Sequence, residues 1–189
     1  DLGSAIHFTV HNTKLAECVL EVNGKQAIPA EVKTLTSSGK VAIKAMPKGR
    51  FHEIYQDYVC GCVLRVAREI FALLPVDALL VTASVDLLDP RTGQMIGQPV
   101  LSVFMPRTVV ARLDFDRIDA SDAMENFKHR GDFKASRKSE AFQPIIPLTP
   151  ADIVQDSIQD MGFNDLFANA QKMREELKSK IAELSPRDD

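Results

Sequence analysis

The chain has 189 residues, 45% of them hydrophobic, and a formal net charge of −3 at neutral pH. A chain of this length can bury one sizeable core, and its mild acidity gives no overall basic field for nucleic acids or anionic membranes. No apolar run approaches the roughly 20 residues of a membrane span and the N-terminus lacks a signal-peptide pattern, so we expect a cytoplasmic protein. Because the chain starts at Asp1 rather than Met, we also expect it to belong to a larger polypeptide.

Period-two alternation of apolar and polar residues predicts the first strands. These strands are expected at residues 4–11, 16–22 and 40–45. Asn23-Gly24, between the second and the third, suits a tight hairpin turn because both residues tolerate positive φ. We therefore predict a returning strand at residues 25–28.

A long amphipathic helix is predicted at residues 48–74. Its apolar residues recur at three- and four-residue steps, which gathers them onto one face. They are Phe51, Tyr55, Tyr58, Val59, Cys62, Val66, Ile70 and Leu73. Pro75 ends the helix and a strand at residues 78–88 follows at once, so we expect the sheet that contains this strand to cover the apolar face.

The segments after this strand contain turn and helix signals. Residues 89–93 are typical of a hairpin loop, with a partner strand at 99–105. Short helices are expected at residues 108–113 and 120–128. Asp119 is the candidate cap of the second helix, and residues 129–143 show little periodicity, which predicts a loop.

The C-terminal region carries a helix-start signal and an apolar stripe. Thr149 is a candidate N-cap, with Pro150 at the first helical position. In the last predicted helix, residues 164–184, apolar residues alternate at three- and four-residue steps, and such a stripe requires a partner. The interaction residues expected from it are Leu166, Met173, Leu177 and Ile181.

These elements predict an α+β fold. We expect a mostly antiparallel sheet of five or six strands with the long helix packed across it. Residues 1–148 form the expected core domain, and residues 149–189 form a helical C-terminal extension.

The three cysteines are too few for a disulfide framework, and we expect reduced thiols. Cys60 and Cys62 lie two apart on the helix, so they point to nearly opposite sides and cannot hold one ion together. Cys62 falls on the apolar stripe, whereas Cys60 is expected near the surface. The sequence predicts no metal site and no cofactor.

Glu31-Val32-Lys33 resembles the acidic-x-lysine element of the restriction-endonuclease-like nucleases. The resemblance covers these three residues and implies that Glu31 binds a metal ion and that Lys33 lies beside the scissile phosphate. That family supplies an aspartate from an earlier strand, but Asp1 is the only aspartate before Asp57. Glu21 would have to take that place, and the alternative is a solvated strand edge.

Cations and aromatic rings alternate between residues 127 and 142. The cations that could bind phosphates are Lys128, Arg130, Lys134, Arg137 and Lys138. With Phe127, Phe133 and Phe142 between them, they could clamp a single-stranded nucleic acid. A solvated loop with its rings docked on the core would have the same sequence.

Carboxylates gather in two further places. Glu53 and Asp57 lie four apart on the helix and could share a cation, although a solvated helix face has the same spacing. Four aspartates lie between residues 114 and 122, and two of them are candidate helix caps.

No motif in the chain specifies a reaction. Together with the apolar terminal stripe, this favours a non-catalytic interaction or assembly module, with a protein partner or a second copy bound through the C-terminal helix. The alternative is a nucleic-acid-acting domain, either a metal-dependent nuclease or a single-strand binder.

Overall fold

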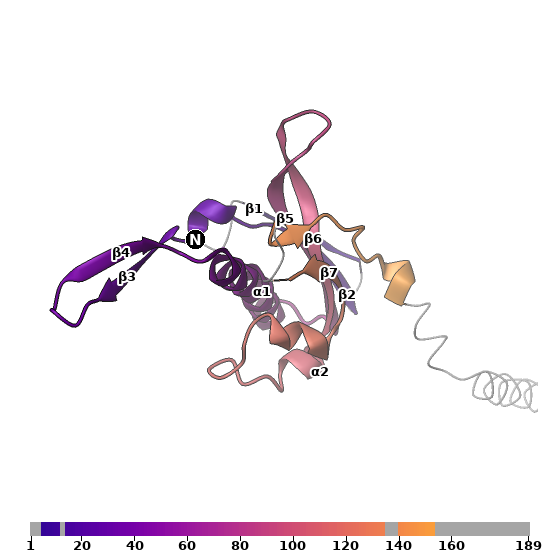
Figure 1. Ribbon diagram of the computed structural model, residues 1–189. Helices are drawn as coiled ribbons and strands as arrows, with labels where there is room; N and C mark the ends of the chain where they lie inside the picture. Colours follow the sequence, from indigo (N-terminus) through magenta and orange to yellow (C-terminus); the bar gives the residue numbers. More distant parts are fainter. Residues whose placement is uncertain (1–4, 12–13, 135–139, 154–189) are drawn as a thin grey trace, which may run out of the picture. The chain divides into compact units, whose positions relative to one another are not determined.

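The computed structural model of the protein describes residues 5–11, 14–134 and 140–153. By its internal packing the chain divides into two units, Asp1–Leu148 and Thr149–Asp189. The first unit is an α+β structure with one long helix, as the sequence predicts (Figure 1). In the described part of the chain, no helix combines the length and apolar character that crossing a bilayer requires.

Six strands form the main sheet, in the order β1-β2-β5-β6-β7-β8. Their bounds are β1 Ala5–Val10, β2 Leu15–Glu21, β5 Ala78–Leu88, β6 Met95–Pro106, β7 Lys128–Phe133 and β8 Phe142–Gln143. β2 and β5 run parallel, whereas the other four pairs of neighbours are antiparallel. The sheet is therefore mixed.

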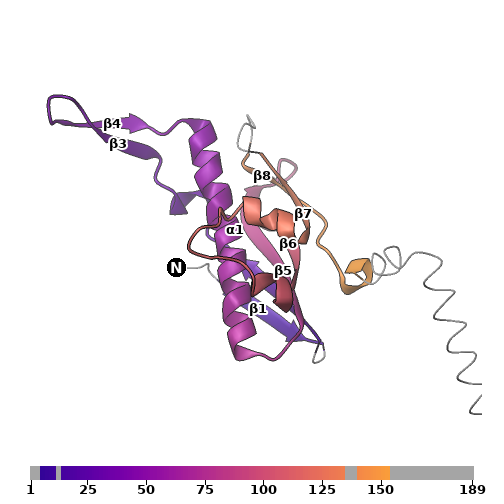
Figure 2. The same ribbon diagram turned by 90° about the horizontal axis from the view of Figure 1, so that it is seen from below.

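Helix α1 (Lys48–Leu73) connects the two parallel strands and packs on one face of the sheet (Figure 2). Parallel neighbours cannot be joined by a tight turn, and a crossover helix is the usual connection. Val59, Val63 and Ala67 of α1 are fully buried in the core. The predicted helix is confirmed, and most of its apolar stripe is covered. Leu73, in the last turn, is 81% exposed.

The C-terminal end of α1 is closed by an arginine from another element. Leu74 ends the helix in an extended conformation, so the last carbonyls lack the usual left-handed cap. Arg107, the first residue of α2 (Arg107–Val110), donates to Val76 O at 2.7 Å and to Phe71 O at 2.8 Å, and it also bonds Leu74 O. Its guanidinium lies 4.7 Å from the Phe71 ring centroid.

A second side of α1 is covered by the segment between α2 and β7. Arg68 of α1 lies over the Phe115 ring at 5.1 Å. Ala123 and Met124, in the short 3-10 helix η2 (Asp122–Asn126), are buried in the core. Cys60 is consequently fully buried, and the prediction that it lies near the surface is wrong.

The predicted hairpin at Asn23-Gly24 is also wrong. Gly24 has φ −70°, and the residues after it form a 3-10 turn, η1 (Lys25–Ala27). β2 has no free edge for a returning strand, because β1 and β5 occupy its two sides. The Asn23 side chain instead donates to the Tyr58 hydroxyl at 3.3 Å.

A separate two-stranded sheet is inserted between β2 and α1. β3 (Glu31–Leu35) and β4 (Val41–Ala45) pair only with each other, and Figures 1 and 2 show them standing apart from the main sheet. The predicted strand at residues 40–45 is thus confirmed. Gly39 takes φ +75° at the turn, which glycine adopts without strain.

The region after α2 differs most from its prediction. Residues 129–143 are not a loop throughout, since β7 and β8 lie there. The helix predicted at residues 120–128 is reduced to η2, because Lys128 already pairs with Phe104 of β6. The strand β7 is held by its pairing with β6, which lies some thirty residues earlier in the chain, so the sequence of β7 itself carries little periodicity.

In the second unit, the predicted N-cap at Thr149 is confirmed. Asp152 N donates to Thr149 Oγ1 at 3.4 Å, and Thr149 N donates to the Asp152 carboxylate at 2.8 Å. Residues 150–153 are helical, and the predicted helix at 164–184 lies outside the described residues.

Candidate functional site

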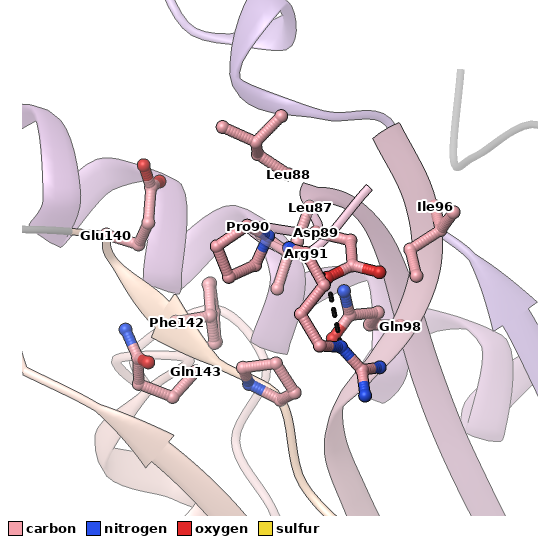
Figure 3. Close-up of a pocket in the computed structure, with 11 residues that line it drawn as sticks. Leu87, Leu88, Asp89, Pro90, Arg91, Ile96, Gln98, Glu140, Phe142 and Gln143 are labelled. Atoms are coloured by element: carbon pink, nitrogen blue, oxygen red, sulfur yellow. Dashed lines mark hydrogen bonds and ion pairs between the residues drawn. The ribbon is translucent and has the colours of Figure 1, made fainter. Parts of the chain in front are cut away.

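A hollow of about 610 Å³ lies at the turn end of the β5–β6 hairpin. Figure 3 shows its two walls, one from the hairpin and one from β8 and the residues beside it. The hairpin wall contains Leu87, Leu88, Asp89, Pro90, Arg91, Ile96 and Gln98. The opposite wall contains Glu140, Phe142, Gln143 and Pro144.

The turn at residues 89–94 holds the hairpin wall in place. Asp89 is 6% exposed, and its carboxylate accepts from Arg91 N at 2.9 Å and from Thr92 Oγ1 at 3.2 Å. Gly93, at φ +68°, donates its N–H to Asp89 O at 2.8 Å. The buried carboxylate is therefore used by the turn itself and is not presented to a ligand.

Glu140, together with Leu87 and Leu88, lines both this hollow and a smaller neighbour of about 240 Å³. Its carboxylate forms an ion pair with Lys25. Apart from this pair, the polar groups on the walls are mostly amides and the arginine. The residues that line the larger hollow include no His, Ser, Thr, Cys, Lys or Tyr, and its two carboxylates, Asp89 and Glu140, contact the turn and Lys25.

Asp57 of α1 and Asp119 of the covering segment bring two carboxyl groups together. Burial, and secondarily the charge of Asp119, raise the pKa of Asp57 above its ordinary value, although hydrogen bonds from Ser121 oppose this. Backbone and side-chain hydrogen bonds from Asp122 and Ser121 lower the pKa of Asp119. The pair thus differs in proton affinity, as in acid–base sites, but it lines neither the hollow of about 610 Å³ nor its smaller neighbour. Its contacts hold the covering segment on α1.

The three cysteines are free and buried. Burial raises the pKa of Cys18 to about 11 and raises that of Cys60 further. Thiols that stay protonated at neutral pH are poor nucleophiles and poor metal ligands. Within the described residues, no group of three or more His, Cys, Asp or Glu side chains could hold a metal ion.

The two nuclease candidates lie on the separate hairpin. Glu31 and Lys33 are both in β3, on one face and exposed to solvent. Glu53, on α1, forms an ion pair with Arg50 at 2.6 Å, and Asp57 faces Asp119. These carboxylates are therefore engaged in separate places, and the structure does not gather them around Glu31.

The predicted clamp around residue 130 has its rings turned into the protein. Phe127 and Phe142 are 7% and 1% exposed, and the rings of Phe133 and Phe142 are 5.4 Å apart. Arg130 lies in β7 and donates to Pro147 O at 3.1 Å, whereas Lys134 follows the strand. The remaining candidates, Arg137, Lys138, Leu166, Met173, Leu177 and Ile181, lie outside the described residues.

Sequence reasoning missed the surface with the most exposed apolar side chains. Leu35, Val41 and Ile43 are 76%, 61% and 56% exposed on one face of the β3–β4 hairpin. The signal was available, because residues on either side of the Ser37-Ser38-Gly39 turn can be paired in register, which brings these three residues together.

Comparison with family models, with curated proteins and with solved structures found no match to this chain. Support for a function therefore comes from the geometry of the chain itself.

Proposed function

We propose that this chain is a non-catalytic interaction module that binds a protein partner through the apolar face of the β3–β4 hairpin. The observation that carries the proposal is the exposure of Leu35, Val41 and Ile43 on that face. In the register of the hairpin, Leu35 lies opposite Val41, and Ile43 lies opposite Lys33. The three side chains thus form one continuous apolar patch near the tip.

The physical reason is that this hairpin has too little support of its own. A single two-stranded sheet is marginally stable in water, and a third strand or a packed surface is normally needed. Here the tip is organised by Thr36, whose N–H and hydroxyl both donate to Lys40 O at 2.8 and 2.9 Å. An ordered hairpin with an uncovered apolar face is a typical binding surface.

The C-terminal extension supplies a second contact in this proposal. We propose that the helix that begins after Thr149 belongs to a helical extension whose apolar stripe, Leu166, Met173, Leu177 and Ile181, binds a protein partner or a second copy. A cytoplasmic setting fits the three free thiols. A chain that ends at Ile153 should then lose part of the affinity for the partner and keep the contact made by the hairpin.

Site-specific photo-crosslinking of the full chain in cells tests the hairpin surface. A photoreactive residue at position 35 or 43 should give a discrete protein adduct, since both positions lie on the apolar face. The matched controls are positions 34 and 44, which lie on the opposite face of the same strands. Equal adducts at all four positions, or none at any, would contradict the proposal.

A second candidate function is nucleic-acid binding at the same hairpin. Residues 25–50 contain six cations and one acid, although the whole chain has a net charge of −3. Three of the cations, Lys33, Lys40 and Lys44, lie on or beside the hairpin strands. This concentration of charge is what phosphate contacts require.

Two measurements separate this candidate from the first. Binding to a single-stranded oligonucleotide should weaken with salt and be lost in a Lys33→Ser/Lys40→Ser/Lys44→Ser variant. A nuclease would also cleave only with Mg²⁺ or Mn²⁺ and would lose that activity in Glu31→Gln. No mobility shift at low salt would exclude both possibilities.

A further inference from the structure

The outer strand of the six-stranded sheet lacks the features that normally protect an edge. β1 pairs with β2 on one side, and no described strand pairs with its other side. Its sequence, Ala-Ile-His-Phe-Thr-Val, contains no proline, glycine, lysine or acidic residue, and its pairing with β2 is regular throughout. Natural proteins usually block free edges with such residues or with bulges, so an open edge of this kind is suited to pairing.

The backbone groups at this edge can be assigned from the register. His11 N donates to Leu15 O at 3.1 Å, which continues the β1–β2 ladder by one pair. Hydrogen-bonded pairs alternate along an antiparallel ladder, so the odd-numbered residues of β1 bond to β2. The even-numbered residues Ile6, Phe8 and Val10 therefore direct their N–H and C=O groups outward.

The side chains of the same three residues extend the core face of the sheet. Phe8 lies opposite Cys18 in the register, and Ile6 and Val10 lie opposite Leu20 and Ala16, all three of which are at most 1% exposed. On β1, however, the exposed fractions are 44% for Ile6, 60% for Phe8 and 49% for Val10. The apolar face thus continues to the edge, beyond the part that is covered.

We propose that β1 pairs antiparallel with β1 of a second copy of this chain, about a two-fold axis at Phe8. In this register Phe8 lies opposite Phe8 of the other copy, and Ile6 lies opposite Val10. Each outward-facing residue then donates one backbone hydrogen bond and accepts another. A shift of two residues would place one of the three opposite a residue outside β1, so this register pairs the most residues of the strand.

A second copy fits the edge because the strand is complementary to itself. His7 lies opposite Thr9 in the proposed register, so no like charges face each other, and Phe8 gives an aromatic cross-strand pair. The two-fold axis is perpendicular to the sheet, so the two uncovered strips join on one face. The interface is isologous and closes after two copies. This surface is separate from the β3–β4 hairpin, and the inference does not depend on the proposed function.

Light scattering on the full chain over a dilution series tests the dimer. We expect a dimer that dissociates on dilution, and we expect Phe8→Lys to weaken it roughly tenfold or more, because two lysines would meet at the axis. The matched control is His7→Lys, which adds the same charge to the neighbouring position but places it opposite Thr9. That variant should remain dimeric.

Cross-linking tests the register independently. Chains carrying Ile6→Cys and chains carrying Val10→Cys should form a disulfide-linked dimer when mixed and mildly oxidised, and neither should do so alone. The native cysteines Cys18, Cys60 and Cys62 are at most 5% exposed and do not interfere. The substitutions Leu35→Ser, Val41→Ser and Ile43→Ser on the β3–β4 hairpin should leave this cross-link unchanged.

Three results would overturn the proposal. The first is a monomer at every concentration, which would show that the strip stays open or is covered by another segment of the same chain. The second is a dimer that survives Phe8→Lys but is lost when the chain ends at Ile153, which would assign association to the C-terminal extension. The third is cross-linking of either cysteine variant alone, which would exclude the register.

Discussion

Arg107 is the residue on which the junction between α1 and β5 depends. Its planar guanidinium donates hydrogen bonds to the backbone carbonyls of Phe71, Leu74 and Val76 and also lies over the Phe71 ring. A lysine retains the positive charge at the helix C-terminus, but its single ammonium group cannot reproduce the three hydrogen bonds of the planar guanidinium. Arg107→Lys should therefore lower the free energy of unfolding in urea by about 1–3 kcal/mol.

Arg91 provides the matched control for this substitution. Its side chain is 89% exposed, and its Nε lies 3.5 Å from Asp89 Oδ1. Arg91→Lys should change stability by less than about 0.5 kcal/mol. Equal losses in the two variants would show that the carbonyl contacts of Arg107 are not the cause.

The pH dependence of stability should reveal the Asp57–Asp119 pair. The pKa of Asp57 is raised in the folded state, so this group favours folding when it is protonated and loses that contribution as pH rises through its folded pKa. Asp57→Asn should therefore stabilise the protein at neutral pH, and the gain should disappear below pH 3.8, the ordinary value. Urea unfolding at a series of pH values measures this effect.

Asp119 should behave in the opposite way. Hydrogen bonds lower the pKa of Asp119 in the folded state. Its ionised carboxylate therefore stabilises the fold at pH values above the ordinary aspartate pKa, and this stabilisation is lost as the pH falls through the folded-state pKa. Asp119→Asn should consequently destabilise the protein at neutral pH. The same sign of change in both variants would contradict the opposite directions in which folding shifts the two pKa values.

These residue-level features could be predicted only in part. The spacing along α1 identified the side that faces the sheet, and Cys62 and Val66 are buried as expected. It could not show that residues 111–127 return to cover another side. For this reason the sequence places Cys60 near the surface, and neither alternative for Asp57, a shared cation or a solvated helix face, includes its contact with Asp119.

Two glycines in different elements should respond in opposite ways to alanine. At Gly131 in β7, an added Cβ would lie 2.8 Å from Phe133 Cε1 and 3.0 Å from Leu101 Cδ1. Leu101 is fully buried and Phe133 packs against the core, so Gly131→Ala should destabilise the protein by about 1–3 kcal/mol through overpacking. Thermal unfolding followed by circular dichroism measures the change.

Gly61, in the middle of α1, is the control. The nearest atom to its added Cβ is Ala120 Cβ at 3.9 Å, an ordinary contact. Because alanine forms helices better than glycine, Gly61→Ala should stabilise the protein by about 0.5–1 kcal/mol. Destabilisation by Gly61→Ala would contradict the open 3.9 Å contact between this position and Ala120.

At the scale of elements, prediction succeeded where the signal was local. The α1 helix and the β5 strand have strong periodicity and clear ends, and the structure places them at Lys48–Leu73 and Ala78–Leu88. The turn at Asn23-Gly24 failed because the neighbour of β2 is β5, which comes more than fifty residues later. The Asn23-Gly24 dipeptide contains no information on which distant strand will pair with the edge of β2.

For the whole molecule, the buried core predicts that the first unit folds without the second. Among the described residues, all members of the core cluster lie between Ala16 and Phe142. A chain that ends at Leu148 should therefore unfold in one cooperative transition, with a midpoint in urea close to that of the full chain. A broad transition or a large loss of midpoint would show that residues after Leu148 belong to the same cooperative unit.

The parallel pairing of β2 with β5 also sets the order of events during synthesis. Leu15 pairs with Ala78, so the pairing of β2 with β5 cannot form until β5 has left the ribosome. The β5–β6 hairpin, by contrast, joins strands that are adjacent in the sequence and can form soon after both are synthesised. Until β5 is available, β1 and β2 form an unsupported two-stranded sheet with exposed apolar side chains. During this interval we expect the nascent chain to be most prone to aggregation and to chaperone binding. Slowing translation just before codon 78 should lengthen this exposed interval and lower the yield of correctly assembled chains.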